Sequence, residues 1–383
     1  MSVKTHILTS LADVPAGDWD AVANSDAARV NPFVSHAFLW ALEKSGSATA
    51  KTGWAARHVV IEEGGKVVGA VPCYLKPHSK GEYVFDHGWA DAFARAGGHY
   101  YPKLQVSVPF SPVVAPKLLA QDLAMRVLLA GQLVALGKVE KASSVHVTFS
   151  SETDAEALRG NPQWLERHDI QFHWHNAGYS SFEDFLAALS SSKRKNIRKE
   201  RAAVRAAGIT FQALTGDDIK AHHWGAFWEF YMDTGSRKWG QPYLTRQFFT
   251  MIHETMRQQI LLVMAHRDGK PIAGALNFIG GDTLYGRNWG CVENLPFLHF
   301  ETCYYQAIDF AIARGLKVIE AGAQGEHKLA RGYVPVKTVS FHYLAHPGLA
   351  RAVADYLEGE REAIAEGQEA LAAHAPFRHV EQE

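Results

Sequence analysis

Asn31–Leu42 reads NPFVSHAFLWAL, and 210 positions later Gln241–Ile252 reads QPYLTRQFFTMI. The two stretches align without a gap as x-Pro-aromatic-aliphatic-hydroxyl-x-x-Phe-apolar-x-x-aliphatic. A Gly-Lys turn inside an extended apolar run follows each of them, at Gly65-Lys66 and at Gly269-Lys270. This spacing is far longer than the roughly 20 to 50 residues of a solenoid repeat. The sequence therefore predicts a duplicated domain.

The composition agrees with two globular domains in a chain of 383 residues, of which 47% are hydrophobic. The net charge is -1, so any affinity for anions must come from local patches. The three cysteines have no metal-ligand spacing and leave an odd thiol, which favours a reducing, cytoplasmic location. No signal peptide is expected, and charged residues interrupt the apolar run at 118–139, so no transmembrane segment is expected.

Each half is expected to run strand, helix, helix, hairpin, strand, helix, strand. A long helix is predicted over residues 117–136 and a hairpin over residues 259–279. This order predicts an α/β fold (α+β, with a mixed sheet) that has helices on both faces of the sheet. We place the boundary near Gly178, which gives one domain over residues 1–178 and a second over 179–383 with a basic helix first and a helix last.

Two segments carry a resemblance to a known family. Phe182–Gly208 (FEDFLAALSSSKRKNIRKERAAVRAAG) and the glycine-rich Glu320–Tyr333 (EAGAQGEHKLARGY) are similar to the FemAB-like, or FemABX, peptidoglycan-associated acyltransferases of the GNAT superfamily. The resemblance implies two tandem GNAT-like acyltransferase domains. The coiled-coil arm of the family is absent, and Tyr83–Pro116 is closer to a proteobacterial FemAB-like subgroup.

The basic segment predicts an anion-binding helix face. At 100° per residue, Arg194, Arg198, Arg201 and Arg205 fall within roughly 60° of one another on a helix. Guanidinium groups suit phosphate, so the face is expected to bind a phosphorylated small-molecule or lipid-linked acceptor, or a tRNA. The alternative is a solvated helix whose arginines pair with carboxylates of the other domain. The expected binding residues are Arg194, Asn196, Arg198, Lys199 and Arg201.

The glycine-rich turn predicts the reaction centre. A strand that ends at Glu320 and feeds glycines and then a helix is a place where backbone amides can face a ligand. Acyl transfer needs a group that moves a proton and groups that stabilise an oxyanion. The expected catalytic residues are Glu320, Asn288, Lys328 and Tyr333, and the expected binding residues beside them are Trp289, His327 and Arg331. A structural hydrogen-bond or ion-pair role for the acidic residues stays open.

The first domain is expected to shape the acceptor pocket, and its candidates are Asp86, Trp89, Tyr101 and Lys103. His173 and His175 share one face of a strand but lack a third metal ligand, so they are expected to be surface or cleft histidines and no metal is expected.

The sequence predicts an N-acyltransferase that moves an aminoacyl or other acyl group to an amine on a phosphorylated, peptidoglycan-precursor-like acceptor. A recognisable acetyl-coenzyme A loop is missing, which argues against an ordinary acetyltransferase. The resemblance likewise implies a donor other than acetyl-coenzyme A, and the donors we consider are aminoacyl-tRNA and an acyl-CoA. No DNA is expected as a partner. Two alternatives remain: a non-catalytic protein that binds cell-wall precursors, and a conventional acetyl-CoA-dependent GNAT acetyltransferase.

Overall fold

The computed structural model describes residues 3–238, 242–322, 325–374 and 376–378. The chain divides into two compact units. The first contains residues 1–170, 243–248 and 337–367, and the second contains 171–242, 249–336 and 368–383. Four elements have residues in both units: β9 (Leu165–His175), α9 (Arg246–Met256), β15 (Val334–Leu344) and α12 (Pro347–Ala373). A contiguous boundary at residue 178 stays a prediction.

The first unit contains two groups of strands. One is a sheet in the order β1-β3-β4-β7, and the other runs β15-β8-β6-β5-β2. Its strands are β1 (Val3–Leu8), β2 (Ala55–Ala56), β3 (His58–Glu63), β4 (Lys66–Val71), β5 (Cys73–Lys76), β6 (Lys103–Val106), β7 (Leu119–Ala120) and β8 (Ser144–Val147). Its helices are α1 (Ala16–Ala23), α2 (His36–Lys44), α3 (His87–Arg95), α4 (Leu123–Val139) and α5 (Glu152–Arg159).

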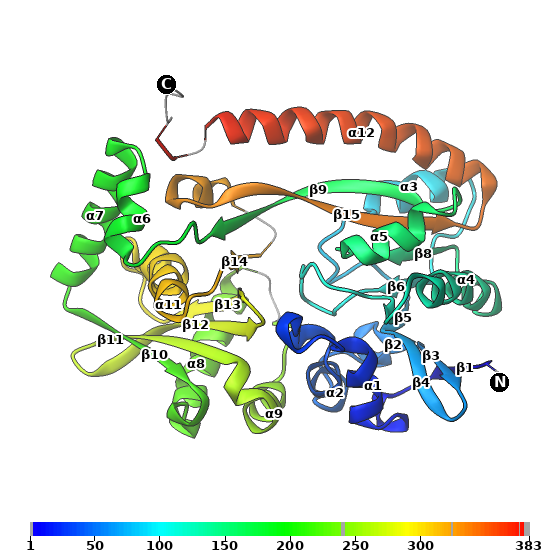
Figure 1. Ribbon diagram of the computed structural model, residues 1–383, viewed down its shortest axis with the longest axis horizontal. Helices are drawn as coiled ribbons and strands as arrows, with labels where there is room; N and C mark the ends of the chain where they lie inside the picture. Colours follow the sequence, from blue (N-terminus) through cyan, green and yellow to red (C-terminus); the bar gives the residue numbers. More distant parts are fainter. Residues whose placement is uncertain (1–2, 239–241, 323–324, 375, 379–383) are drawn as a thin grey trace. The chain divides into compact units, whose positions relative to one another are not determined.

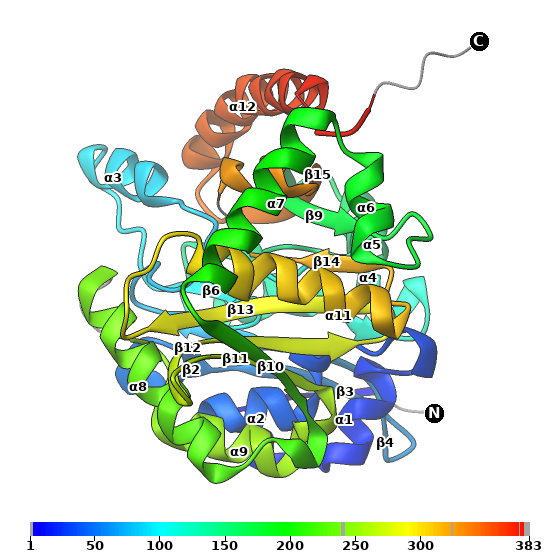
Figure 2. The ribbon, with the colours of Figure 1, turned by 90° about the vertical axis from the view of Figure 1, so that its left-hand side faces the viewer.

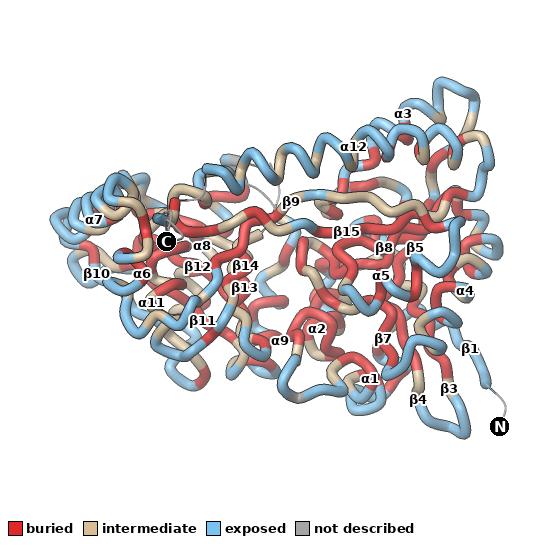
Figure 3. The backbone as a smooth tube through the Cα atoms, turned by 45° about the horizontal axis from the view of Figure 1, so that its top comes forward, coloured by how far each residue is buried: buried red, intermediate tan, exposed pale blue. Residues whose placement is uncertain are grey.

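The two faces of β6 and β8 differ in polarity. Leu104 and Val106 on β6 and Val145 and Val147 on β8 pack in one apolar core with Leu133 of α4. Side chains alternate along a strand, so the intervening residues face the other way. These are polar and buried: Lys103, Gln105, Ser144 and His146. Figure 3 shows how strongly β8 and β15 are buried.

The second unit contains the strand order β10-β11-β12-β13-β14-β9. Its other strands are β10 (Ile209–Thr215), β11 (Ile260–Arg267), β12 (Lys270–Gly280), β13 (Thr283–Cys291) and β14 (Val318–Glu320). Its helices are α6 (Phe182–Ala188), α7 (Ser191–Ala206), α8 (Ala221–Lys238), α10 (Leu298–Phe300) and α11 (Gln306–Arg314). A π-helical turn (Glu301–Tyr305) joins α10 to α11, and the 3₁₀ helix η8 (Glu326–Arg331) follows β14.

Helices cover both faces of this second group of strands (Figures 1 and 2). Ile308 of α11 packs with Val263, Leu284 and Ile319 on one face. On the other face, α8 lies against Gly274 and Gly290, which are partners in the register of β12 and β13. A Cβ atom on Gly290 would lie 2.2 Å from the carbonyl oxygen of Phe230 on α8. Only glycine allows α8 to approach this closely.

The strands β13 and β14 are parallel and separate after three paired positions. The last pair is Tyr285 with Glu320, where β14 ends while β13 continues to Cys291. At the same point the register of β13 with β12 shifts between the pairs Asn277–Gly286 and Leu276–Asn288, so β13 contains one extra residue, Arg287. Such a bulge bends a strand and redirects its side chains.

The duplicated sequence forms the same local structure twice. Ser35 caps α2 by accepting a hydrogen bond from the Phe38 backbone N–H at 3.3 Å, and Thr245 accepts one from the Phe248 N–H at 3.3 Å at the start of α9. Phe38 and Phe248, at equivalent positions, contact each other edge to face with ring centroids 5.6 Å apart. Gln241, the first residue of the second copy, lies outside the described residues. The helix expected over 117–136 begins later, at Leu123, because Leu119–Ala120 pairs with β4 as β7.

We expect Gly290→Ala to lower the free energy of unfolding by about 1 to 3 kcal/mol, because the new methyl group overlaps the α8 backbone. The control is Gly225→Ala, which lies on α8 itself. A Cβ atom at position 225 meets nothing within 4 Å, and the higher helix propensity of alanine should stabilise this variant by about 1 kcal/mol. Urea denaturation of both variants makes the comparison. Wild-type stability in Gly290→Ala would contradict the close contact of α8.

Candidate functional site

A buried polar group of side chains lies at the end of β14. Glu320 is 3% exposed and its Oε1 accepts a hydrogen bond from Arg287 Nη2 at 2.6 Å. Glu320 lies opposite His173 of β9 in an antiparallel register, so these two side chains share one face of the strands. The bulge in β13 brings Arg287 to this face beside them.

Lys328 joins this group from η8. Its Nζ donates to the carbonyl oxygens of Ala321 at 2.7 Å and Gly322 at 3.0 Å, and the residue is 2% exposed. Burial, together with the nearby charge of Arg287, lowers the pKa of Lys328 to about 8, although Glu320 acts in the opposite direction. An amine with this pKa changes its protonation close to neutral pH. Such groups are suited to moving protons in catalysis.

His173 and Arg287 belong to this group although the sequence did not single out Arg287 and placed His173 at the surface or in a cleft. His173 is 9% exposed, and burial with the charges of His175, Arg287 and Lys328 lowers its pKa to about 3. The spacing of His173 and His175, two residues apart on one strand face, was the only sign in the sequence that His173 could belong to a site. The residues around His173 come from β13, β14 and η8, and no sequence pattern links those elements to β9.

The structure does not bring all four expected catalytic residues together. Glu320 and Lys328 belong to one electrostatic group. Tyr333 is fully buried, packs against Tyr304 with ring centroids 5.5 Å apart, and its hydroxyl has no hydrogen-bond partner among the described residues. Asn288 pairs with Leu276 in the register of β12, and the Trp289 ring contacts His299. Catalytic roles for Tyr333 and Asn288, and binding by Trp289, stay predictions.

Arg331 is held by its own surroundings. Its guanidinium lies 3.4 Å from the centroid of the Phe300 ring, and Nη2 donates to Glu200 at 2.9 and 3.1 Å. Its Nη1 donates to the His327 carbonyl oxygen at 2.7 Å. The exposed His327 ring hydrogen-bonds the Tyr304 hydroxyl at 2.9 Å. Arg331 thus fixes η8 to α7 through Glu200, and ligand binding by Arg331 and His327 stays a prediction. Residues 323–324 of the glycine-rich turn lie outside the described residues.

The basic residues of α7 divide into two groups. Arg201 Nη2 pairs with Asp309 at 2.6 Å and Glu301 at 3.0 Å, and Arg198 pairs with Glu183 at 2.5 Å. The carboxylates are those of the same unit, not of the other domain as the alternative interpretation supposed. Asn196 and Lys199 are exposed and Arg194 is half-buried, and within the described residues none of the three has a carboxylate partner. Arg198 is paired, but its side chain is still 55% exposed.

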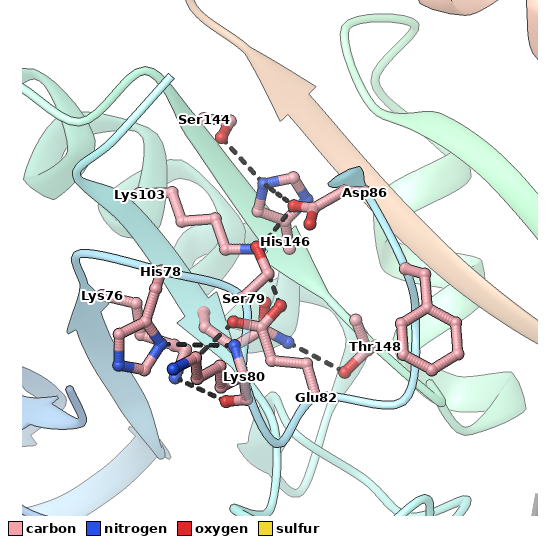
Figure 4. Close-up of polar contacts among 12 residues, drawn as sticks. Lys76, His78, Ser79, Lys80, Glu82, Asp86, Lys103, Ser144, His146 and Thr148 are labelled. Atoms are coloured by element: carbon pink, nitrogen blue, oxygen red, sulfur yellow. Dashed lines mark hydrogen bonds and ion pairs between the residues drawn. The ribbon is translucent and has the colours of Figure 1, made fainter. Parts of the chain in front are cut away.

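Two of the first-unit candidates, Asp86 and Lys103, meet in a second, closed cluster (Figure 4). Lys103 Nζ donates to Glu82 at 2.6 Å and also to Asp86, and all three side chains are at most 2% exposed. Asp86 also accepts from the Tyr100 hydroxyl at 2.8 Å. Lys76 lies 3.6 Å from Glu82. Burial lowers the pKa of Lys76 to about 7, so Lys103 is the main counter-charge of the two buried carboxylates.

Charge pairing determines the ionisation of this cluster. Burial alone would raise the pKa of Asp86, but the charges of Lys103 and His146 hold it well below its ordinary value. Burial alone would lower the pKa of Lys103, but Glu82 and Asp86 raise it. The Tyr101 hydroxyl bonds Ser79 at 2.9 Å, and Trp89 packs in a small apolar cluster. The four first-domain candidates are therefore close together, and their role in acceptor binding stays a prediction.

The first unit also has an open pocket of about 440 Å³, which the sequence did not indicate. It is lined by residues that include Trp40, Lys44, Trp54 and Arg57. Lys44 Nζ lies 5.8 Å from the Trp40 ring centroid, and Arg57 pairs with Glu140 at 2.7 Å. The lining contains Glu43 as well as the two cations, so the pocket has no single sign of charge.

The described part of the chain contains no group of three or more His, Cys, Asp or Glu side chains arranged to hold a metal ion. Within the same residues, every helix is too short or too polar to cross a bilayer.

Comparisons with known proteins identify one family. A model of the FemAB-like family, described as peptidoglycan biosynthesis and recognition, matches residues 10–379. No curated protein matches the chain. The match confirms the resemblance expected from the two segments, and the mixed strand order confirms the predicted α/β fold class with a mixed sheet.

Solved structures share this fold at low sequence identity. The crystal structure of FemX is 13% identical, covers 92% of this chain and 100% of its own, and has a TM-score of 0.54. The C-terminal domain of a putative lysylphosphatidylglycerol synthetase from Agrobacterium fabrum is 9% identical, and the match covers 91% of this chain and 97% of that domain with a TM-score of 0.52. A conserved protein of unknown function from Bacteroides thetaiotaomicron is 13% identical, and the match covers 86% of this chain and 97% of that protein with a TM-score of 0.51.

We expect Lys103→Met to lower the free energy of unfolding by about 3 to 5 kcal/mol, because it leaves two buried carboxylates without their shared cation. The control is Lys317→Met, which removes an exposed pair with Asp282 and should cost at most about 1 kcal/mol. Chemical denaturation at neutral pH measures both. Equal stabilities in the two variants would mean that the cluster does not hold the first unit together.

Proposed function

This chain belongs to the FemAB-like family, and from that premise we propose that it is an N-acyltransferase. The transferred group would be an aminoacyl or other acyl group, and the acceptor an amine on a phosphorylated, peptidoglycan-precursor-like molecule. The family description supports the cell-wall assignment. The fold shared with the putative lysylphosphatidylglycerol synthetase, whose name denotes a phospholipid that carries a lysyl group, supports aminoacyl transfer.

One observation carries the proposal: Lys328, with its pKa near 8, is fixed where β13 and β14 separate. Strands that separate in this way leave backbone groups able to bind an extended ligand, and backbone pairing of this kind is a common mode of recognition. The buried Arg287–Glu320 pair joins the end of β14 to the bulge in β13 at this point. The proposed transfer therefore takes place beside Lys328.

The chemistry follows from the protonation of Lys328. The amine nitrogen attacks the activated acyl carbon, a C–N bond forms, and the bond from that carbon to the leaving oxygen or sulfur breaks. Neutral Lys328 takes the proton that the amine loses and passes it to the leaving atom. Binding energy and orientation supply most of the remaining rate, because an ester or thioester donor is already activated.

The accessible residues of α7, Arg194, Asn196 and Lys199, are the proposed contacts for phosphate on the acceptor or on a tRNA. An aminoacyl-tRNA or an acyl-CoA is the proposed donor, and the cytoplasm is the proposed location. Arg198 and Arg201 already have carboxylate partners, so their contribution would be mainly to fix the helix.

A second candidate function is recognition of cell-wall precursors without catalysis. The word recognition in the family description favours it. The ion pairs of Lys103 with Glu82 and Asp86 are an example in this chain of buried charged residues with a structural role, and the residues around Lys328 could have the same role. Binding of a UDP-linked muropeptide without product formation from any donor would support this second candidate.

We expect kcat/KM for transfer to rise with pH through about 8, because the lowered pKa of Lys328 makes the neutral, proton-accepting form increase across that range. Lys328→Arg keeps the charge but cannot lose it, so it should be at least about 100-fold slower at every pH. Mass spectrometry of UDP-linked muropeptides incubated with aminoacyl-tRNA or acyl-CoA measures the product. Exposed Lys317→Arg is the control and should match the wild type. Wild-type turnover by Lys328→Arg would refute the assignment.

A further inference from the structure

His173 occupies a central place on the polar face of the second unit. It lies on β9 opposite Glu320 of β14, and it is close enough to Arg287 of β13 and Lys328 of η8 for both charges to affect it. With 9% of its surface exposed, it is buried but not sealed from a ligand.

A hydrogen bond on β9 fixes which ring nitrogen carries the proton. His173 Nε2 lies 3.2 Å from the Oε1 atom of Gln171, two residues earlier on the same strand face. With the Gln171 amide oriented in this way, its oxygen accepts the hydrogen bond, so Nε2 carries the hydrogen and Nδ1 carries the lone pair. Among the described residues, no hydrogen bond to Nδ1 is present, so this acceptor is available to a ligand.

The charges around the ring keep it neutral. Burial lowers the pKa of His173 to about 3, and His175, Arg287 and Lys328 add to this effect because each repels a proton on the imidazole. Glu320 faces the ring from β14, but Arg287 pairs with that carboxylate. At neutral pH, Nδ1 is therefore always a hydrogen-bond acceptor.

We propose that His173 Nδ1 and Lys328 Nζ together form a binding position for an uncharged primary amine. This inference rests on the proposed function, and it adds the group that recognises the nucleophile. One amine N–H would donate to His173 Nδ1, which directs the nitrogen lone pair toward the acyl carbon. The C–N bond then forms, the bond to the leaving atom breaks, and the second amine proton passes through neutral Lys328 to the leaving atom. His173 itself gains and loses no proton.

The charge distribution explains why the amine must be uncharged. An ammonium ion would lie next to Arg287 and near Lys328, whereas a neutral amine has a lone pair for attack and hydrogens that match the acceptor on His173. The site therefore selects the reactive form of the amine by repelling the inert form.

Two substitutions of His173 test the acceptor role. His173→Leu removes the acceptor and should reduce kcat/KM about 100-fold, the scale of a misplaced reactant. His173→Asn places an amide oxygen near the former Nδ1 and should recover most of that loss. The control is His222→Leu, which replaces an exposed histidine on α8 and should stay within about twofold of the wild type. Equal losses in His173→Leu and His173→Asn, or no loss in either, would overturn the inference.

Gln171→Glu gives an independent readout. A carboxylate next to Nε2–H favours the imidazolium ion and raises the pKa of His173. Below the raised pKa of His173 the rate should then fall more steeply with decreasing pH than the titration of Lys328 alone produces in the wild type, because an imidazolium cannot accept the amine hydrogen bond. An unchanged profile in this variant, with a raised His173 pKa measured by NMR, would contradict the inference.

Nitrogen-15 NMR of the free protein requires no substrate. It should show a neutral His173 with the proton on Nε2 between pH 5 and 8, and a proton on Nδ1 would overturn the inference. An active wild type with an unaffected His173→Leu variant refutes the amine site alone. A wild type that transfers nothing to the muropeptide probe from either donor refutes the proposed function and the amine site with it.

Discussion

The hydrogen bonds from Lys328 to the carbonyl oxygens of Ala321 and Gly322 are the contacts on which the proposed chemistry depends. They hold a buried amine where β14 ends and β13 continues. Burial in that position lowers the pKa of the amine to about 8. A single constraint thus supplies both the location and the protonation behaviour of the proposed reaction centre.

The first unit uses a comparable arrangement of strands differently. Its parallel strands β6 and β8 also have an apolar face covered by a helix and a polar face opposite. There, Lys103 is neutralised by Glu82 and Asp86, and burial does not free it for proton transfer because its pKa is raised. The opposite pKa shifts of Lys103 and Lys328 therefore follow from their partners: two carboxylates contact Lys103, whereas Lys328 contacts carbonyl oxygens and lies near Arg287.

Sequence patterns predicted the features that depend on local order. The repeat around Pro32 and Pro242, the hairpin at Gly269 and the basic helix of α7 all follow from periodicity and turn residues. Glu320 and Lys328 were identified because a glycine-rich turn joins them in the chain. The carboxylate partners of Arg201 could not be identified from the sequence, because Asp309 and Glu301 lie about 100 residues further along the chain.

The missed residues share one cause. Arg287 reaches the site because of a bulge in β13, and His173 because β9 pairs with β14 in an antiparallel register. Neither the bulge nor the register has a signature in the chain itself. The same bulge changes which residues of β13 face the site, and the contacts of the described residues join neither Asn288 nor Trp289 to Lys328.

The most direct test is a crystal structure of the protein with a non-hydrolysable acyl donor analogue. The account predicts that the acyl carbonyl lies next to Lys328 Nζ and His173, where β13 and β14 separate. An acyl group bound instead against Asp86 and Lys103 in the first unit would contradict it.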